Sequence, residues 1–401
     1  MNKKILTESS IIVLAIILVS LIMRSPITAL PLILNNIADA LKTNASSLSI
    51  LTTIPLIMFM LVSNFASKII QVLGLKRALG CAVLTVVIGS LLRVMMTMPT
   101  MLVGTILIGV GIAQLNVFMP SFVAAYFPNK IGLYTSVYSF SMMSGPTLFS
   151  LITAPVTTLF GWKMIMWLLL ILPTAAILLW WIASRRLPDI DQPKKEDVAQ
   201  KKTDVVLAKT WTNPRAWAFL LVFGIQSLIN YTAVAWLPSL MALHHVSSGR
   251  VGFLMSLYSF IAMPISLLLP SLLLRLSNKT QVIMTTIFGS MGIIGSGLLF
   301  FQQTSSVWYW ALIALTAGVT TAFFFVYVMT MFGIKTDHYE NTARLSGMAQ
   351  TGGYFLASLG PIAYGLAFQS HPEGIGQNIV YMLVVIIMIF CSFVVVKTKK
   401  I

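Results

Sequence analysis

The stretch IIVLAIILVSLIMRSPITALPLIL, from Ile11 to Leu34, is apolar almost throughout and contains one charged residue, Arg24. A bilayer crossing needs about 20 consecutive apolar residues, so this stretch predicts a membrane-spanning helix. Arginine keeps its proton inside proteins. Placing it at the centre of a bilayer costs about 2.5–3.5 kcal/mol on insertion scales. Other parts of the chain must therefore offset the cost of this charge.

Apolar runs of similar length recur along the whole chain of 401 residues, of which 58% are hydrophobic and 9% charged. A soluble domain usually carries about 25% charged residues, so this composition is that of a polytopic membrane protein. We expect the first run to be retained, because no small-residue cleavage site of a signal peptide follows it. The predicted spans are 8–34, 46–67, 77–97, 101–127, 131–156, 162–184, 215–241, 250–274, 279–301, 306–333, 343–368 and 377–396.

A polar stretch divides these spans into two sets of six. Its Lys, Asp, Glu and Gln composition cannot build a packed core, so we interpret it as a solvated linker. The sequence predicts an all-α membrane protein of twelve transmembrane helices. Its expected parts are an N-terminal six-helix bundle at 1–184, a cytoplasmic linker at 185–214 and a C-terminal six-helix bundle at 215–401. Repeated halves of this kind are common in transporters.

Lysine and arginine collect on one side of this topology, and cytoplasmic loops are the ones that carry such an excess. Lys42, Lys163 and Arg250 fall on the opposite side. Arg93 is placed near the outer end of its helix, where we expect its long stem to reach the lipid headgroups. Both termini are therefore predicted to be cytoplasmic, in a multi-pass protein of the cytoplasmic membrane. The net charge of +16 is a topology signal and does not indicate nucleic-acid binding.

Cysteine and glycine add two smaller expectations. Cys81 and Cys391 lie far apart in apolar runs, which favours neither a disulfide nor a metal site. Glycine is frequent in the spans 101–127 and 343–368, where small residues let helices approach closely. The glycines of the first of these spans are Gly104, Gly109 and Gly111.

The surroundings of Arg24 favour an anion site. All ten acidic residues lie in loops or at the ends of predicted helices, so no carboxylate reaches the middle of the membrane. Pro26 and Pro31 free the carbonyls of Ile22 and Ile27, which can accept from the guanidinium without neutralising it. An unpaired cation in a wet cavity of the membrane is a site for an anion. The alternative is a structural arginine tethered to backbone carbonyls.

Four stretches resemble the major facilitator superfamily, and within it the cyanate porter and nitroimidazole transporter family. They are RSPITALPLI (Arg24–Ile33), NVFMPSFVAAYFP (Asn116–Pro128), FGIQSLINYTAVAWLP (Phe223–Pro238) and ARLSGMAQTGGYFLASLGPIAYG (Ala343–Gly365). The resemblance covers nearly the whole chain, and the last two stretches are the most specific. The chain departs from the family pattern at Ala124, Asn230 and Gln71, which bears on the substrate and on a gating contact but not on the fold.

Uncharged polar residues supply the other candidates for substrate binding. The resemblance implies a cavity lined mainly by the first, fourth, seventh and tenth helices, with the second, fifth, eighth and eleventh beside them. Members of three polar pairs share a helix face because they are four positions apart: Tyr134 with Tyr138, Gln226 with Asn230, and Gln350 with Tyr354. The predicted substrate-binding residues are Arg24, Asn116, Tyr138, Gln226, Asn230, Gln350 and Tyr354. For the uncharged ones, the alternative is hydrogen bonding between helices, worth about 0.6 kcal/mol per contact on average.

We therefore expect a secondary active transporter that moves a small anion or small polar solute by alternating access. A polyspecific drug or toxic-compound exporter of the same superfamily is the alternative, although exporters of cations usually need a buried carboxylate. A membrane-embedded enzyme would need a nucleophile with a base, or a metal cluster, and no His or carboxylate lies in the middle of the spans. We expect a monomer in the lipid bilayer, with a small-molecule or small-anion substrate and no cofactor, metal or nucleic-acid partner.

Overall fold

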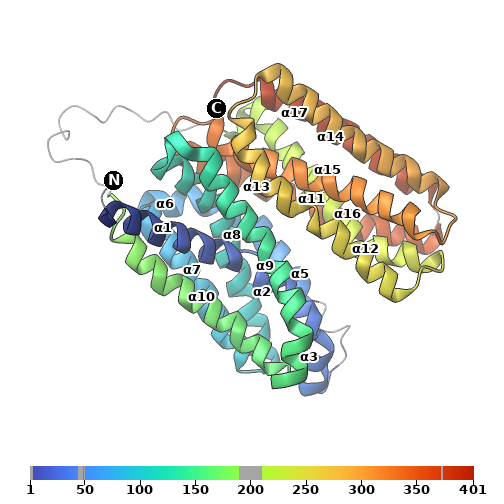
Figure 1. Ribbon diagram of the computed structural model, residues 1–401, viewed down its shortest axis with the longest axis horizontal. Coiled ribbons are helices and arrows are strands. Elements are labelled where there is room, and N and C mark those ends of the chain that lie inside the picture. Colours follow the sequence, from blue (N-terminus) through green and yellow to red (C-terminus); the bar gives the residue numbers. More distant parts are fainter. Residues whose placement is uncertain (1–2, 44–47, 49, 189–209, 372–373) are drawn as a thin grey trace. The chain divides into compact units, whose positions relative to one another are not determined.

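The computed structural model describes residues 3–43, 48, 50–188, 210–371 and 374–401. Every regular element in these ranges is a helix, and within each unit the long helices lie lengthwise beside one another (Figure 1). The predicted linker at 185–214 falls mostly outside the described residues.

Two compact units make up the chain, and each is described by itself. The first comprises Met1–Asn129, Val137–Lys209 and His338–Gly347. The second comprises Lys130–Ser136, Thr210–Asp337 and Met348–Ile401. The bundle boundaries expected from the sequence remain a prediction.

The helices follow one another along the chain without long interruptions. Before the linker they are α1 (Lys3–Ile22), α2 (Ser25–Thr28), η1 (Leu30–Ile33), α3 (Leu34–Ala40), α5 (Ile50–Val62), η2 (Ser63–Phe65), α6 (Ala66–Leu73), α7 (Leu75–Val94), α8 (Met98–Tyr126), η3 (Pro128–Lys130), α9 (Ile131–Phe160) and α10 (Lys163–Ser184). After it they are η4 (Thr210–Thr212), α11 (Pro214–Leu243), α12 (Ser248–Phe260), α13 (Ala262–Leu273), α14 (Asn278–Leu298), η5 (Leu299–Phe301), α15 (Val307–Ile334), α16 (Tyr339–Ser370) and α17 (Ile375–Lys397).

Ten segments of the described chain are long and apolar enough to cross a membrane. They coincide with ten of the predicted spans. The other two predicted spans, 131–156 and 343–368, fall within α9 and α16, which are helices of 30 and 32 residues. The predicted all-α membrane fold is confirmed.

Four of the predicted spans are divided into shorter helices. The span predicted at 8–34 is divided among α1, α2, η1 and α3, and the span predicted at 250–274 is divided into α12 and α13. The span at 46–67 covers α5, η2 and part of α6, and the span at 279–301 covers α14 and η5. Pro264 is the third residue of α13. Because its ring clashes with the carbonyl four residues earlier and it lacks an N–H, α12 ends at Phe260.

The helices α8 and α15 lie at the centres of their units. Of their apolar windows, 72% and 83% of residues are buried. Glycine lets α8 approach α7, since a Cβ added to Gly89 would lie 2.6 Å from the carbonyl oxygen of Gly104. A Cβ on Gly111 would lie 2.6 Å from Cγ2 of Val86. The packing role predicted for these glycines is confirmed.

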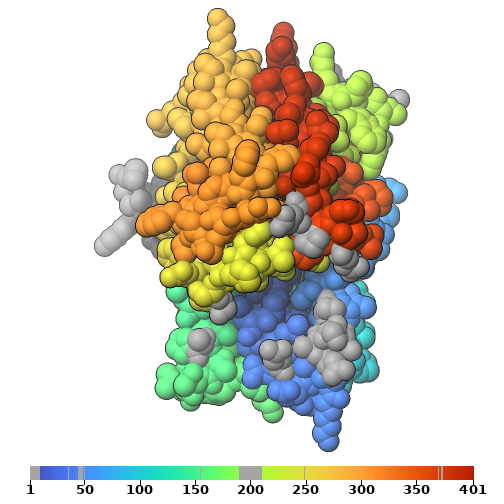
Figure 2. Space-filling view, turned by 90° about the vertical axis from the view of Figure 1, so that its right-hand side faces the viewer, coloured from blue at the N-terminus to red at the C-terminus, as the bar shows by residue number. Residues whose placement is uncertain are grey.

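Apolar side chains also cover the outside of the second unit. On α17 the exposed residues Leu383, Ile387, Phe390 and Val394 follow helical spacing and form one stripe. The neighbouring α14 exposes Ile283, Ile287 and Ile294. Figure 2 shows the two helices side by side on this face, α14 in gold-orange and α17 in red. An outward apolar surface of this extent fits a bilayer and would not be tolerated in water.

Candidate functional site

Arg24 lies at the break in the first span, between α1 and α2. It is the N-cap of α2, with φ −129° and ψ −39°, and its carbonyl oxygen accepts a hydrogen bond from the backbone nitrogen of Ile27 at 3.1 Å. Pro26 explains the break, because it has no N–H to donate to the carbonyl of Ile22 and its ring clashes with that carbonyl, and α1 ends at Ile22. The Oγ of Ser25 donates to the carbonyl of Leu21 at 2.7 Å. The Arg24 side chain is half-buried.

Arg93 of α7 is held against the same break. Its Nη1 donates to the carbonyl oxygen of Pro26 at 2.8 Å, and its Nε donates to Oγ1 of Thr105 at 3.0 Å. The residue is only 2% exposed, so the expectation that it extends to the lipid headgroups is wrong. The physical reason is that charge-assisted bonds to a carbonyl and a hydroxyl inside the protein replace hydration at the surface.

The buried guanidinium of Arg93 retains one unused group. Its Nη2 is buried and makes no hydrogen bond in the described part of the chain. The backbone-tethered arginine that was considered for Arg24 is therefore realised at Arg93. The backbone carbonyl that holds Arg93 is that of Pro26, which can accept the bond because the helix is broken there.

The two other candidates in the first unit are buried. Asn116 of α8 is 2% exposed and Tyr138 of α9 is fully buried. Nearby on α8, Nε2 of Gln114 donates to the carbonyl of Val62 at 2.8 Å. That bond joins α8 to the end of α5, so an amide on this helix does serve helix packing.

In the second unit, Gln226 and Asn230 share a face of α11 but have different partners. Gln226 is buried, and its Nε2 donates to Oγ of Ser227 at 2.8 Å. Asn230 is half-buried, and its Oδ1 accepts from the hydroxyl of Tyr258 at 2.9 Å. That hydroxyl also lies 3.2 Å from Oγ1 of Thr321. Helices α11, α12 and α15 thus contribute one residue each to a polar cluster.

Sequence reasoning missed Tyr258 and Thr321, because each is a single polar residue in an apolar run. The second pair, Gln350 and Tyr354 of α16, is buried as well. The ring of Tyr354 packs edge-on against Phe223 of α11, with ring centroids 5.2 Å apart. A Cβ added to Gly353 would meet Cδ1 of Phe223 at 2.5 Å, so α16 and α11 are in close contact here.

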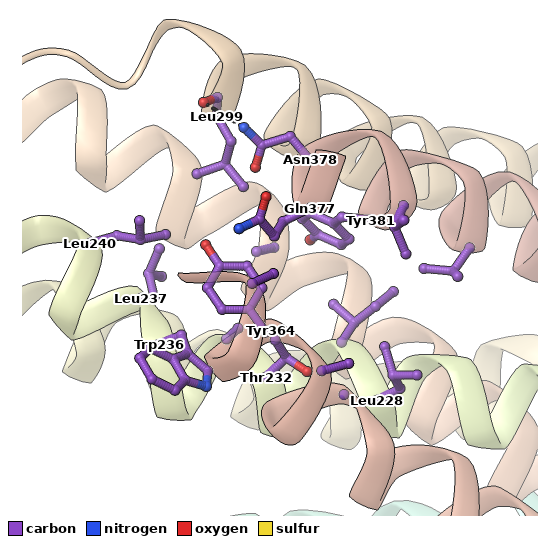
Figure 3. Close-up of a pocket in the computed structure, with 18 of the residues that line it drawn as sticks. Leu228, Thr232, Trp236, Leu237, Leu240, Leu299, Tyr364, Gln377, Asn378 and Tyr381 are labelled. Carbon is purple, nitrogen blue, oxygen red and sulfur yellow. Dashed lines mark hydrogen bonds between the residues drawn. The ribbon is translucent and has the colours of Figure 1, made fainter. Parts of the chain in front are cut away.

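The second unit also contains an apolar pocket of about 450 Å³ among α11, α15, α16 and α17. Figure 3 shows Trp236 and Tyr364 on one side of it and Tyr381 with Gln377 on the other. The indole Nε1 of Trp236 donates to the carbonyl of Pro361 at 2.9 Å, which fixes the ring. The hydroxyls of Thr232 and Tyr381 are buried and make no hydrogen bond within the described residues.

The structure thus divides the seven predicted residues between the units. Arg24, Asn116 and Tyr138 belong to the first, and Gln226, Asn230, Gln350 and Tyr354 belong to the second. None of the four in the second unit lines the apolar pocket. Within the described residues, no cluster of three His, Cys, Asp or Glu side chains could hold a metal ion.

The fold and the buried polar residues can now be compared with known proteins. The family model described as "Major Facilitator Superfamily" matches residues 12–361. The chain belongs to the major facilitator superfamily. It is 30% identical over 374 residues to an uncharacterized transporter, YycB, of Bacillus subtilis, a match that covers 92% of this chain and 89% of the relative.

Two other relatives are named for the solutes they transport. The chain is 28% identical over 358 residues to the 2-nitroimidazole transporter of Escherichia coli, covering 88% of this chain and 87% of that protein. It is 22% identical over 291 residues to the cyanate transport protein CynX of the same organism, covering 70% and 72%. These matches confirm the resemblance to the cyanate and nitroimidazole type of facilitator.

Solved structures support the facilitator fold. The chain superimposes on the proton:xylose symporter XylE, bound to 6-bromo-6-deoxy-D-glucose, with a TM-score of 0.76. The match covers 95% of this chain and 94% of that one at 12% identity, so it shows the fold alone. As a facilitator, this protein is a multi-pass membrane protein that transports small solutes.

Proposed function

We propose that this facilitator is a secondary active transporter of small anions, which binds its substrate at Arg24 and moves it across the cytoplasmic membrane by alternating access. One observation carries the proposal. Arg24 and Arg93 converge on one break of the first span, while none of the ten candidate spans in the described chain contains an Asp or Glu. Two arginines at one break, in spans that contain no Asp or Glu, create a positive potential that attracts an anion.

The two arginines have different parts in this proposal. Arg93 is buried and uses two of its donors on the protein, so it contributes a fixed charge. Arg24 is half-buried, and in this proposal its guanidinium contacts the solute. A guanidinium presents planar paired donors that match a small oxyanion better than an ammonium does. Asn116 and Tyr138, a buried amide and a buried tyrosine of the same unit, would orient the anion.

The relatives support the same chemical class. Cyanate, which one relative is named for, is a small monovalent anion. In this chain the first span carries the cation at a helix break, where backbone groups are not all committed to the helix. Both termini are proposed to face the cytoplasm, because lysine and arginine collect on that side of the topology.

A second candidate function is the export of neutral aromatic compounds. The apolar pocket among α11, α16 and α17 favours it, since Trp236, Tyr364 and Tyr381 offer ring surfaces. Pockets of roughly 300–1,000 Å³ with few polar groups are typical of small-molecule sites. A relative named for 2-nitroimidazole, a neutral heterocycle, supports this alternative.

Uptake into proteoliposomes tests the proposal, with cyanate and other small monovalent anions in one arm and 2-nitroimidazole in the other. We expect anion uptake by the wild type, its loss in Arg24→Ala, and a large loss of affinity with intact folding in Arg24→Lys. Arg250→Ala, at an exposed position of α12, is the matched control and should transport normally.

Thermal melting of the same purified variants separates binding from folding. Arg24→Ala should melt at or above the wild-type temperature, because the insertion cost of about 2.5–3.5 kcal/mol disappears. The transported anion should stabilise the wild type, by about 2.7 kcal/mol at one hundred times its Kd, and should not stabilise the Ala variant. Normal anion transport by Arg24→Ala, or its failure to fold, would contradict the proposal. Transport of 2-nitroimidazole alone, insensitive to Arg24, would favour the second candidate.

A further inference from the structure

A second pocket, of about 960 Å³, lies in the first unit where several helices end. It is bordered by the last turn of α6, the first turns of α7, the end of α10 and the first residues of α16. The indole Nε1 of Trp180 donates to the carbonyl of Lys76 at 3.2 Å, and Nζ of Lys76 donates to the carbonyl of Leu187 at 3.2 Å. These bonds tie the start of α7 to the end of α10, so the walls are held in place.

The charge of this pocket is predominantly positive. Lys76, Arg77 and Arg185 line it, and Glu340 is the acidic residue among the lining residues. Neither Arg77 nor Arg185 has a carboxylate within 4.0 Å in the described residues, and both side chains are exposed. The guanidinium carbon of Arg185 lies 3.7 Å from the centre of the Trp181 ring, which restrains it beside the pocket. The excess of positive charge calls for an anionic occupant.

The position of the pocket indicates which anion that is. The spans Ile50–Leu73 and Lys163–Ser184 end here, and Leu75–Val94 begins here, so the pocket lies at the boundary between hydrocarbon and water. The lining residues Leu178 and Trp181 are 61% and 57% exposed. They form an apolar surface beside the charged residues of the pocket. A soluble phosphate would use only the cations. A phospholipid would use the cations with its headgroup and the apolar surface with its chains.

We propose that this pocket binds an anionic phospholipid, whose phosphate is held by Arg77 and Arg185 and whose acyl chains lie along α10. Arginine suits the phosphate because its planar fork donates two parallel hydrogen bonds to phosphate oxygens. Basic residues beside a membrane surface each strengthen binding to anionic lipid by about fivefold. The proposal is independent of the solute that the transporter carries.

The test uses the purified full chain in detergent, delipidated and then titrated with phosphatidylglycerol, phosphatidylcholine or inorganic phosphate. Bound lipids are counted by native mass spectrometry, and thermal melting is followed in parallel. The wild type should bind phosphatidylglycerol at least several-fold more tightly than phosphatidylcholine and should melt at a higher temperature in its presence. Arg77→Gln and Arg185→Gln should each weaken that binding by about fivefold. Arg215→Gln, an exposed arginine at the start of α11, is the control and should leave it unchanged.

Three results would overturn the proposal. In the first, the wild type binds phosphatidylglycerol and phosphatidylcholine equally well. In the second, inorganic phosphate raises the melting temperature as much as phosphatidylglycerol does. In the third, the Arg77→Gln/Arg185→Gln double variant binds phosphatidylglycerol as tightly as the wild type. If the Gln variants do not fold, Arg77→Lys and Arg185→Lys keep the charge and remove the planar fork. These should still prefer phosphatidylglycerol but bind it less tightly than the wild type, and unchanged affinity would exclude the arginines as phosphate ligands.

Discussion

Nη1 of Arg93 donates a hydrogen bond of 2.8 Å to the carbonyl oxygen of Pro26, and this bond joins α7 to the break in the first span. The carbonyl belongs to the residue two positions after Arg24. Any movement of α7 relative to the break would therefore alter the surroundings of the proposed anion site. In the proposed function, Arg93 would hold the break at Arg24 in position and add a second positive charge.

Arg93→Lys should reduce stability without removing the charge. An ammonium on a shorter stem cannot reproduce both the bond to Pro26 and the bond to Thr105. Losing one hydrogen bond to a charged group costs about 1.5–3 kcal/mol. We expect the purified variant to melt at a lower temperature than the wild type. Arg250→Lys, at an exposed position, should leave the melting temperature unchanged. Thr105→Val leaves Nε of Arg93 without its acceptor. The loss of stability in the Thr105→Val/Arg93→Lys double variant should be smaller than the sum of the two single losses. A loss equal to that sum would mean that the two side chains act separately.

Variants of the polar cluster in the second unit can distinguish a role in helix packing from a role in substrate binding. Tyr258→Phe removes the donor to Oδ1 of Asn230 and the contact with Thr321. The expected loss of stability is about 0.6 kcal/mol and at most about 1.7 kcal/mol, as for other bonds between membrane helices. Asn230→Ala should lower the affinity for the solute more than Tyr258→Phe does, measured by initial uptake rates over a range of concentrations. Equal effects of the two variants on uptake would place Asn230 in helix packing alone.

Gln350→Ala tests the buried amide of α16. If Gln350 binds the solute, transport should weaken while expression and melting temperature stay nearly unchanged. Gln281→Ala is a matched control, because Gln281 is also buried and its Nε2 donates to the carbonyls of Leu273 and Leu276 at 3.1 and 3.2 Å. That variant should lose stability and keep its substrate affinity. If Gln350→Ala behaves in the same way, Gln350 is structural.

Lys335 predicts a pH dependence of stability outside the membrane-spanning segments. Its Nζ donates to the carbonyls of Val396 and Thr398 at 2.9 and 2.7 Å. Burial, and then the positive charge of Lys400, lower the pKa of Lys335 below its usual 10.5. The unfolded chain therefore binds more protons between the two pKa values, so the contribution of Lys335 to stability rises as pH increases through this window toward 10.5.

The measurement is the melting temperature of the wild type minus that of Lys335→Met, followed from neutral pH toward 10.5. We expect this difference to grow with pH. The same comparison for Lys279→Met, an exposed lysine at the start of α14, gives the background. A difference that stays level, or shrinks as pH rises, would contradict the lowered pKa.

The spans could be predicted from the sequence, because span length is a local property, but the break near Arg24 was not predicted; the sequence indicated only that Pro26 and Pro31 free backbone carbonyls. A proline alone does not settle whether a helix breaks, because Pro120 and Pro238 lie inside the continuous helices α8 and α11. The partner of Arg93 could not be predicted, since it depends on which carbonyl α7 meets across the unit. An arginine near a helix end is expected to extend its side chain to the lipid headgroups. Arg93 instead donates to the carbonyl of Pro26.

The same limit applies to the uncharged candidates. Helical spacing placed Gln226 and Asn230 on one face of α11, and this is what α-helical geometry requires. It did not indicate that Gln226 would bond to Ser227 and Asn230 to Tyr258. Ser227 is the chain neighbour of Gln226, whereas Tyr258 comes from another helix and reaches Asn230 through tertiary packing, which no local sequence pattern encodes.

The bond between Arg93 and Pro26 also has a consequence for biosynthesis. The two residues are 67 positions apart, so Pro26 leaves the ribosome well before Arg93 is made. At about 5–20 residues per second, the broken first span waits several seconds for its partner. A nascent chain arrested before residue 93 would hold the break without this bond. Accessibility of a cysteine introduced beside Pro26 should therefore fall when translation passes α7.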